Sequence, residues 1–305
     1  MLSEKNKEKY IKAGKITSQA KEYAKKLIKP EMSLLEIAEK IEAEIVKLGG
    51  KPAFPVSLAI NDEAAHVTPS YNDERVAHGL IKVDLGVHID GFTADSAFTI
   101  NLETGGEDEE NKKLIKASED ALNNAINSIK QNANITLNDI GKEIQETIEK
   151  NKFTPIINLS GHSIEEYDLH SGVTIPNIEN GNNKTLDEGI YAIEPFATNG
   201  NGKVYDGRPS GIYQLQNAKN VRSPLAREVL EFIEDEYSTL PFCSRWLIKK
   251  FGTKVLIALS ELEKSNIIHH YEQLIESGHG KVSQAEHTVL IHKNNGKREV
   301  IVLTE

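Results

Sequence analysis

The chain has 305 residues, of which 38% are hydrophobic and 27% are charged, and its formal net charge at pH 7 is −10. This composition is typical of a globular protein with one large domain or two smaller ones. The acidic charge disfavours a nucleic-acid partner. We expect no membrane attachment, because the sequence has no run of about 18 apolar residues and its charged start lacks the apolar core of a secretory signal. The single cysteine, Cys243, excludes an intramolecular disulfide, and we expect a cytoplasmic location because that compartment is reducing.

The first predicted helix covers residues 4–28 and ends before Pro30. A second helix follows in SLLEIAEKIEAEIVKLGG, where Ser33 and Glu36 predict a capping box and the Gly-Gly pair ends the helix. Its apolar residues have helical spacing and predict one buried face: Ile37, Ile41, Ile45 and Leu48.

A similar unit recurs 103 residues later, in TLNDIGKEIQETIEKNKFTPII, with Thr136 and Asp139 in place of the capping box. At this offset four residues of the first unit coincide with identical residues of the second: Ile37 with Ile140, Ile41 with Ile144, Ile45 with Ile148 and Pro52 with Pro155. Another predicted helix, residues 109–131, precedes this unit. The chain is therefore helix–helix–strands repeated twice, which indicates pseudo-twofold halves rather than a solenoid.

The second half is interrupted after AIEPF, where a loop rich in Gly and Asn covers residues 198–211. Helical patterning then continues to residue 270, and Ser223 and Pro224 are a typical helix start. Strands resume at QAEHTVLIH. We therefore predict an α+β core domain of residues 1–205 and 271–305, with a helical insertion over 206–270.

Residues 83–100, VDLGVHIDGFTADSAFTI, predict a β-hairpin with an Asp-Gly turn. Its arms carry Asp84 and Asp95, although aspartate is rare in strands and unfavourable to bury unpaired. A two-residue turn places both side chains on the same face. Two buried carboxylates repel each other, and a metal ion between them would remove that repulsion.

Three more polar residues interrupt apolar runs: His162 in INLSGHSI, Glu194 in GIYAIEPF and Glu286 in QAEHTVLI. Each alone is more simply explained as a structural or solvent-facing residue. Five such interruptions in equivalent strands of a repeat instead favour one shared site. The set has too many carboxylates for a structural zinc site and is too large for one ion, so it predicts two divalent metals of the manganese, iron or cobalt type. Such metals, about 3.5–4 Å apart, share a hydroxide that attacks a carbonyl, which is hydrolase chemistry.

Two further histidines, His66 in NDEAAHVTP and His170 in EYDLHSG, are not needed as metal ligands. Both could form hydrogen bonds with a substrate carbonyl or amide. Without the five candidate ligands, we would interpret both as histidines that cap loops.

The order D…D…H…E…E, in VDLGVHIDGFTADSA, SGHSI, AIEPF and AEHTVLI, resembles the methionine aminopeptidases of the pita-bread fold over nearly the whole chain. The five-ligand pattern alone is shared with the Xaa-Pro peptidases. The helical insertion, the LPFCSRWL stretch, the eight-residue step from His162 to His170 and the context of His66 resemble the type 2 branch, in the short form typical of archaea.

The resemblance implies two pseudo-twofold-related halves around a curved antiparallel sheet, with a dinuclear metal site between them. It implies that Asp84 binds one metal only and that Asp95 and Glu286 bridge both metals. It assigns His162 and Glu194 to the other metal. The metals it implies are Fe²⁺, Mn²⁺ or Co²⁺, with Zn²⁺ as a further option.

The resemblance also implies roles in catalysis and substrate binding. Glu194 would accept a proton from the nucleophilic water, and His66 and His170 would contact the substrate and the tetrahedral intermediate. Three residues would line the substrate pocket: Phe54, Ile212 and Tyr271.

The implied function is removal of the initiator methionine from nascent proteins when the second residue is small. The expected partners are the N-terminal methionine of nascent polypeptides and, transiently, the ribosome, and we expect a monomer. One alternative is an Xaa-Pro dipeptidase or aminopeptidase, which usually carries an additional N-terminal domain. The other is a non-catalytic pita-bread protein that binds proteins or RNA, a type that typically lacks metal ligands.

Overall fold

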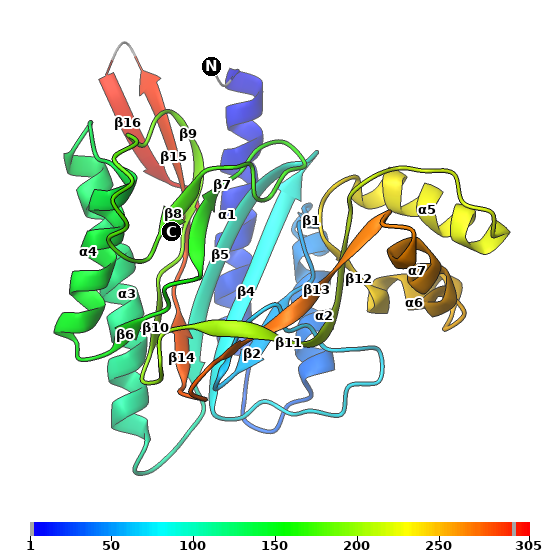
Figure 1. Ribbon diagram of the computed structural model, residues 1–305, viewed down its shortest axis with the longest axis horizontal. Helices are drawn as coiled ribbons and strands as arrows, with labels where there is room; N and C mark the ends of the chain where they lie inside the picture. The colour runs from blue at the N-terminus through cyan, green and yellow to red at the C-terminus, as the bar shows by residue number, and fades with distance from the viewer. Residues whose placement is uncertain (1–2, 295–296) are drawn as a thin grey trace.

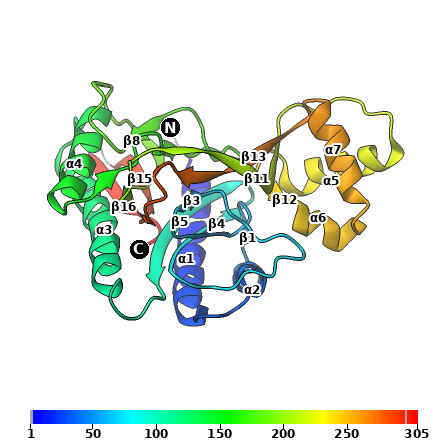
Figure 2. The same cartoon turned by 60° about the horizontal axis from the view of Figure 1, so that its bottom comes forward.

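Two helix pairs form close to their predicted bounds. They are α1 (Glu4–Leu27), α2 (Leu34–Lys47), α3 (Asp108–Gln131) and α4 (Leu137–Lys150). The structure is a computed structural model that describes residues 3–294 and 297–305, and α1, α2 and α3 lie on one side of its strands (Figure 2). The repeat is confirmed because the equivalent isoleucines of α2 and α4 are all fully buried: Ile37, Ile41, Ile45, Ile140, Ile144 and Ile148.

Each half of the chain contributes its own antiparallel sheet (Figure 1). The first sheet contains β1 (Lys51–Pro52), β2 (Ser57–Ile60), β4 (Leu80–Ile89) and β5 (Phe92–Asn101). The second contains β7 (Ser160–Ser163), β8 (Thr174–Pro176), β9 (Gly189–Ile193), β15 (His287–Asn294) and β16 (Lys297–Val302). A smaller sheet of the second half contains β6 (Thr154–Pro155), β10 (Phe196–Thr198) and β14 (Val282–Gln284).

The hairpin of β4 and β5 separates an apolar face from a polar one. Four alternate residues of β4 pack against α1 and α2 in one apolar core: Ile81, Val83, Leu85 and Val87. Strand geometry places the intervening residues, Asp84 and Gly86 among them, on the opposite face. A second core lies between α3, α4 and the strands of the second half. The helices therefore bury one face of each sheet and leave the other available for a site.

Hydrogen bonds between β5 and the residues before and within β15 join the two halves. The Glu286 N–H donates to the Ala97 carbonyl (3.0 Å), and the Ser96 hydroxyl donates to the Glu286 carbonyl (2.8 Å). The Asp95 N–H donates to Thr288 Oγ1 (2.7 Å). The contact between the halves therefore includes the backbone of two candidate ligands, Asp95 and Glu286.

A third region lies at one end of the molecule (Figure 1). It contains α5 (Pro224–Tyr237), α6 (Ser244–Phe251) and α7 (Val255–Lys264), which share a core with neighbouring strands. Those strands belong to a sheet of β3 (Glu63–Ala65), β11 (Val204–Leu215), β12 (Phe242–Cys243) and β13 (Ile268–Glu276). We call α5–α7 the helical unit.

The predicted loop over 198–211 is wrong from residue 204 onward, because β11 begins there. Gly207, Pro209 and Gly211 concealed this strand, since proline and glycine are unfavourable in strand interiors. The strand tolerates them through register shifts against β13 on both sides of Pro209. The domain boundaries at 206 and 270 stay a prediction.

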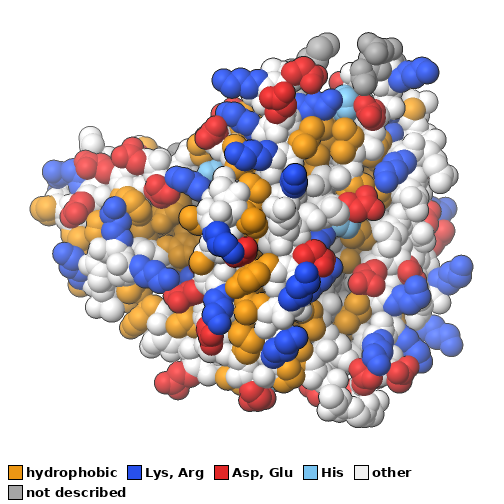
Figure 3. Space-filling view, turned by 180° about the vertical axis from the view of Figure 1, so that it is seen from behind, with side chains coloured by type: hydrophobic (Ala, Val, Ile, Leu, Met, Phe, Trp, Pro, Cys, Tyr) orange, Lys and Arg blue, Asp and Glu red, His pale blue; other side chains and the backbone are white. Residues whose placement is uncertain are grey.

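The outer surface of the helix layer carries charges of both signs. Lysine and arginine side chains lie among aspartate and glutamate side chains on the rear face (Figure 3), as expected for the solvent-exposed side of amphipathic helices. Within the described residues, no helix is long and apolar enough to cross a membrane.

Candidate metal centre

The hairpin places its two aspartates on the same face. Ile89 pairs with Phe92, so the turn between the arms is the two residues Asp90 and Gly91, both with positive φ, as a type I′ turn requires. In this register Asp95 lies opposite Gly86, which shares a face with Asp84. The local sequence therefore brings two carboxylates together.

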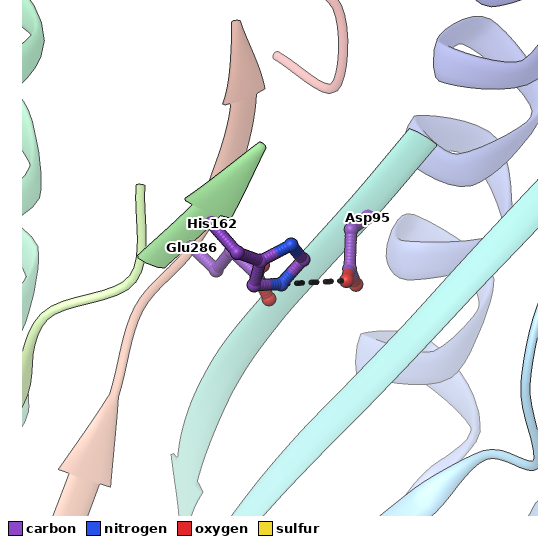
Figure 4. A group of neighbouring side chains, drawn as sticks. All are labelled: Asp95, His162 and Glu286. Carbon is purple, nitrogen blue, oxygen red and sulfur yellow. Dashed lines mark ion pairs between the residues drawn. The ribbon is translucent and has the colours of Figure 1, made fainter. Parts of the chain in front are cut away.

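The second half contributes three side chains to the same place. His162 lies in β7, whereas Glu194 follows β9 directly and Glu286 precedes β15 directly. His162 Nε2 lies 3.5 Å from Glu194 Oε1 and 3.9 Å from Asp95 Oδ2. Figure 4 shows His162 and Glu286 facing Asp95 across the join between the halves. The two glutamates lie where strands break, rather than within strands as the sequence pattern predicted.

The chemistry of this cluster fits divalent cations. One ligand atom from each of Asp95, His162 and Glu286 lies within 4.8 Å of the others, a spacing that suits a metal ion. Among the described residues, Asp84 Oδ1, Asp95 Oδ1 and both carboxylate oxygens of Glu286 are buried without a hydrogen-bond partner. Buried carboxylates are normally paired or coordinate metals. Oxygen-rich sets with one imidazole suit manganese, iron or cobalt.

Burial and mutual repulsion also raise the pKa values of the four carboxylates in the cluster. Burial raises the pKa of Asp84 to about 6. Burial, followed by repulsion from Asp84 and Glu194, raises the pKa of Asp95 well above its usual value. Burial and neighbouring carboxylates also raise the pKa values of Glu194 and Glu286 well above their usual value. The four carboxylates therefore resist ionisation, with Lys21 giving Glu286 only a smaller opposing effect, and bound cations would reverse this resistance.

Burial also acts on the candidate histidine ligand. It lowers the pKa of His162 to about 3, with a smaller contribution from His170, whose ring centroid lies 4.3 Å from that of His162. A neutral imidazole is the form that binds metals.

Gln284 contacts the cluster, although the sequence pattern did not point to it. Gln284 Nε2 donates to Asp84 Oδ2 (3.3 Å) and to Glu194 Oε2 (3.4 Å), so one amide contacts a carboxylate from each half. Its position could have indicated this role, because Gln284 stands two residues before Glu286, and such residues share a face in an extended chain.

A second contribution comes from the C-terminal residues. The Thr288 N–H donates to Thr304 Oγ1 (3.1 Å), and the buried Lys21 ammonium donates to the Thr304 carbonyl (2.8 Å). Lys21 also donates to Ser96, next to Asp95. Helix α1 and the last residues thus support the backbone behind the cluster.

A cavity of about 240 Å³ opens from the cluster. All ten residues predicted as metal ligands, catalytic groups or pocket walls line it: Phe54, His66, Asp84, Asp95, His162, His170, Glu194, Ile212, Tyr271 and Glu286. Residues that the sequence did not single out complete the wall, including Ser57, Asn158 and Pro241. The fold therefore gathers the predicted set in one place.

His66 occupies the wall that faces β13. It has a positive φ of 58°, an unusual conformation for a residue with a side chain. Burial lowers its pKa to about 4, so the ring is neutral at pH 7. Its ring centroid lies 5.2 Å from that of Tyr271. His66 can therefore donate one hydrogen bond and accept another within the cavity.

Comparisons with known proteins agree with this geometry. The family model for metallopeptidase family M24 matches residues 8–293. A methionine aminopeptidase of Pyrococcus horikoshii is 46% identical over 303 residues, which cover 98% of this chain and 99% of that protein. A methionine aminopeptidase of Methanocaldococcus jannaschii is 45% identical over 290 residues, which cover 94% of this chain and 96% of that protein.

Solved structures with lower identity show the same fold. A methionine aminopeptidase of Thermotoga maritima has a TM-score of 0.69 at 24% identity, covering 98% of this chain and 96% of that chain. A thermophilic Arx1 has a TM-score of 0.81 at 16% identity, covering 99% and 91%. A prolidase of Pyrococcus furiosus has a TM-score of 0.62 at 18% identity, covering 99% and 64%. The predicted pita-bread fold is confirmed, and the chain belongs to the metallopeptidase family M24.

Proposed function

We propose that this protein is a metal-dependent methionine aminopeptidase that removes the initiator methionine from nascent proteins when the second residue is small. The observation that carries the proposal is a cavity whose floor holds four carboxylates and one histidine, several of their oxygens buried without partners. The high identity to methionine aminopeptidases over nearly the full chain supports the choice of substrate. The helical unit supports the short type 2 form.

The proposed ligands divide between two divalent cations. Asp84 would hold one ion, His162 and Glu194 the other, and Asp95 and Glu286 would bridge them. Cations at such a site lower the pKa of a bound water and polarise the carbonyl that it attacks. The donor set suits Fe²⁺, Mn²⁺ or Co²⁺, with Zn²⁺ as a further option.

The remaining chemistry belongs to side chains of the cavity. Glu194 can take a proton from the attacking water and pass it to the leaving amine. His66 is neutral and can donate a hydrogen bond to the developing oxyanion. His170, at the exposed edge of the cavity, can contact the same intermediate or the scissile amide.

The walls of the cavity suit an apolar side chain. Phe54 and Ile212 provide apolar surface. The Tyr271 hydroxyl donates to Gln214 Oε1 (2.7 Å), which fixes its ring in the cavity wall. We propose that these residues hold the methionine side chain, that the protein acts as a cytoplasmic monomer, and that it meets its substrates during transient contact with the ribosome.

The nearest alternative is an Xaa-Pro peptidase, because the prolidases share the fold. The two candidates are separated by comparing a Met-Ala-Ser peptide with an Ala-Pro peptide under identical metal loading. We expect cleavage of the methionyl peptide to dominate. Preference for Ala-Pro would reject our proposal in favour of the prolidase function.

The role of Glu194 can be tested with Glu194→Gln, which keeps the shape of the side chain. We expect turnover of a Met-Gly peptide to fall by about 10²–10⁴-fold, the usual contribution of general acid–base catalysis, in a protein that still folds. Near-normal turnover would reject the proton-acceptor role. Separately, chelation should abolish activity, and Mn²⁺, Co²⁺ or Fe²⁺ should restore it.

A further inference from the structure

A buried ion pair connects the helical unit to the core of the molecule. Arg245 of α6 is 1% exposed and Glu42 of α2 is 8% exposed. The guanidinium donates to both carboxylate oxygens, at 2.7 and 2.8 Å. The Trp246 indole N–H donates to the same carboxylate (2.9 Å). This is a bidentate ion pair between two residues that are 203 positions apart in the sequence.

Each member of the pair also holds a cavity segment. Arg245 Nε donates to the Pro69 carbonyl (3.1 Å), and its Nη2 donates to Thr68 Oγ1 (3.4 Å). Glu42 Oε1 accepts from the Val56 N–H (3.4 Å). The pair therefore reaches two separate loops, one after β3 and one before β2.

These loops carry two of the cavity walls. His66 stands two residues before Thr68, and Phe54 stands two residues before Val56. The loops are joined to each other, since the Thr68 hydroxyl donates to the Val56 carbonyl (3.0 Å). A positive φ at a residue such as His66 persists only where its surroundings enforce it. The hydrogen bonds of the pair to Thr68 and Pro69, together with those that Val67 forms with Ser57 and Leu58, hold the segment that follows His66.

Stability alone does not explain such a pair. Replacing a buried ion pair with apolar residues of similar volume is often neutral or stabilising, because both charges must lose their hydration. The pair lies outside the metal cluster, and neither side chain lines the cavity. Its distinguishing feature is the fixed geometry that it gives to two loops.

We propose that Glu42 and Arg245 are positioning residues through which the helical unit fixes His66 and Phe54 in the cavity. The inference rests on the proposed function for the meaning of that geometry. It gives the helical unit a specific role, because α6 supplies Arg245.

The test is the double variant Glu42→Leu/Arg245→Met, in which both charges are removed together and apolar packing is retained. We expect kcat/KM for a Met-Ala-Ser peptide to fall by about 10–100-fold, as small displacements of catalytic groups do, with an increase in KM as well as a decrease in kcat. Metal content per chain should match that of the wild type. Arg245→Lys keeps the charge without the bidentate geometry, and we expect an intermediate loss.

A neighbouring ion pair provides the matched control. Lys249 Nζ lies 2.7 Å from Glu39 Oε1, between the same two helices, but this pair is exposed. Lys249→Met should change kcat/KM by less than about twofold, since exposed pairs contribute little. A double variant with unchanged kcat/KM, or with kcat lowered only in proportion to lost metal or folded protein, would overturn the proposal.

A readout without substrate separates this inference from the proposed function. The ring resonances of His66, assigned with His66→Asn, should shift in the double variant and stay in place in Lys249→Met. If the wild type failed to cleave methionyl peptides, the proposed function would fall, while a shift of these resonances would still support the positioning role. Unchanged His66 resonances in the double variant would contradict it.

Discussion

The two halves of the molecule share their helices and differ in what their strands present to the cavity. The stripes of α2 and α4 are superimposable in sequence and equally buried. The first half supplies its two carboxylates from one hairpin, whereas the second supplies His162, Glu194 and Glu286 from three separate segments. The repeat thus sets the layers of the fold, and the candidate chemistry lies where the copies diverge.

The largest effect is expected when a carboxylate is removed where the two halves meet. We expect Asp95→Asn to lower kcat/KM by more than about 100-fold. This is a larger effect than is typical for residues that only hydrogen-bond to metal ligands. The metal-free variant should be more stable than the metal-free wild type, because one of four mutually repelling buried carboxylates is gone. Peptide kinetics, metal analysis and urea denaturation measure these effects.

The control for Asp95→Asn lies in the same hairpin. Asp90, in the turn, has a side chain that is 72% exposed and lies 3.0 Å from Lys9 Nζ, and asparagine tolerates its positive φ. Asp90→Asn should leave metal content and kinetics unchanged. An equal loss in both variants would mean that the hairpin as a whole, rather than its inward face, is required.

The second test compares equivalent helix positions. Ile41→Ala and Ile144→Ala should each lower the free energy of unfolding by about 2–5 kcal/mol, the usual range for a buried isoleucine, without changing kcat/KM of the folded fraction. Val46→Ala, at a position 60% exposed on α2, is the control and should have little effect. A large difference between the two isoleucine variants would show that the halves are not energetically equivalent.

The third test uses pH on protein freed of metal by chelation. The pKa values of Asp84, Asp95, Glu194 and Glu286 are raised in the folded protein, so above the unfolded value of about 4 these groups bind more protons in the folded state than in the unfolded state. Their contribution to stability must therefore decrease as pH rises, for Asp84 between about pH 4 and its folded pKa of about 6. Buried histidines such as His66 and His162 contribute in the opposite direction, because their pKa values are lowered.

Between pH 5 and pH 8 we expect the free energy of unfolding of Asp95→Asn, measured with urea, to rise by about 1–3 kcal/mol relative to that of the wild type, because the histidines are the same in both proteins. The substitution removes one titrating group and weakens the repulsion on the other carboxylates. A difference between the two proteins that stayed constant or fell with pH would contradict the raised pKa values of the carboxylates.

The sequence predicted the features that repeat and the residues that interrupt apolar runs. Helix bounds and the turn at Asp90 follow from local patterns of spacing and capping, so they could be predicted from short segments. Strand β11 could not, because its glycines and Pro209 imitate a loop and only pairing with β13 makes it a strand. The contacts of Gln284, Lys21 and Thr304 could not be predicted either, because each joins segments that meet only in the folded chain.

The smallest test returns to the two helix starts, where the copies differ in one hydrogen bond. Thr136 and Asp139 form a reciprocal capping box, at 3.1 and 3.0 Å. Ser33 accepts from the Glu36 N–H at 3.4 Å, but the predicted return bond is absent from the hydrogen bonds of the described residues, and Glu36 instead pairs with Lys40. The prediction of a full box at Ser33 is therefore wrong.

The physical reason is that the Glu36 carboxylate is held one turn later by Lys40, at 2.6 Å. We expect Thr136→Ala to lower the free energy of unfolding by about 1 kcal/mol and Ser33→Ala by less, within the range known for capping residues. Thermal or urea denaturation resolves the difference. A larger cost at Ser33 would show that its long hydrogen bond contributes more than its geometry indicates, and that the two helix starts are more alike than their contacts.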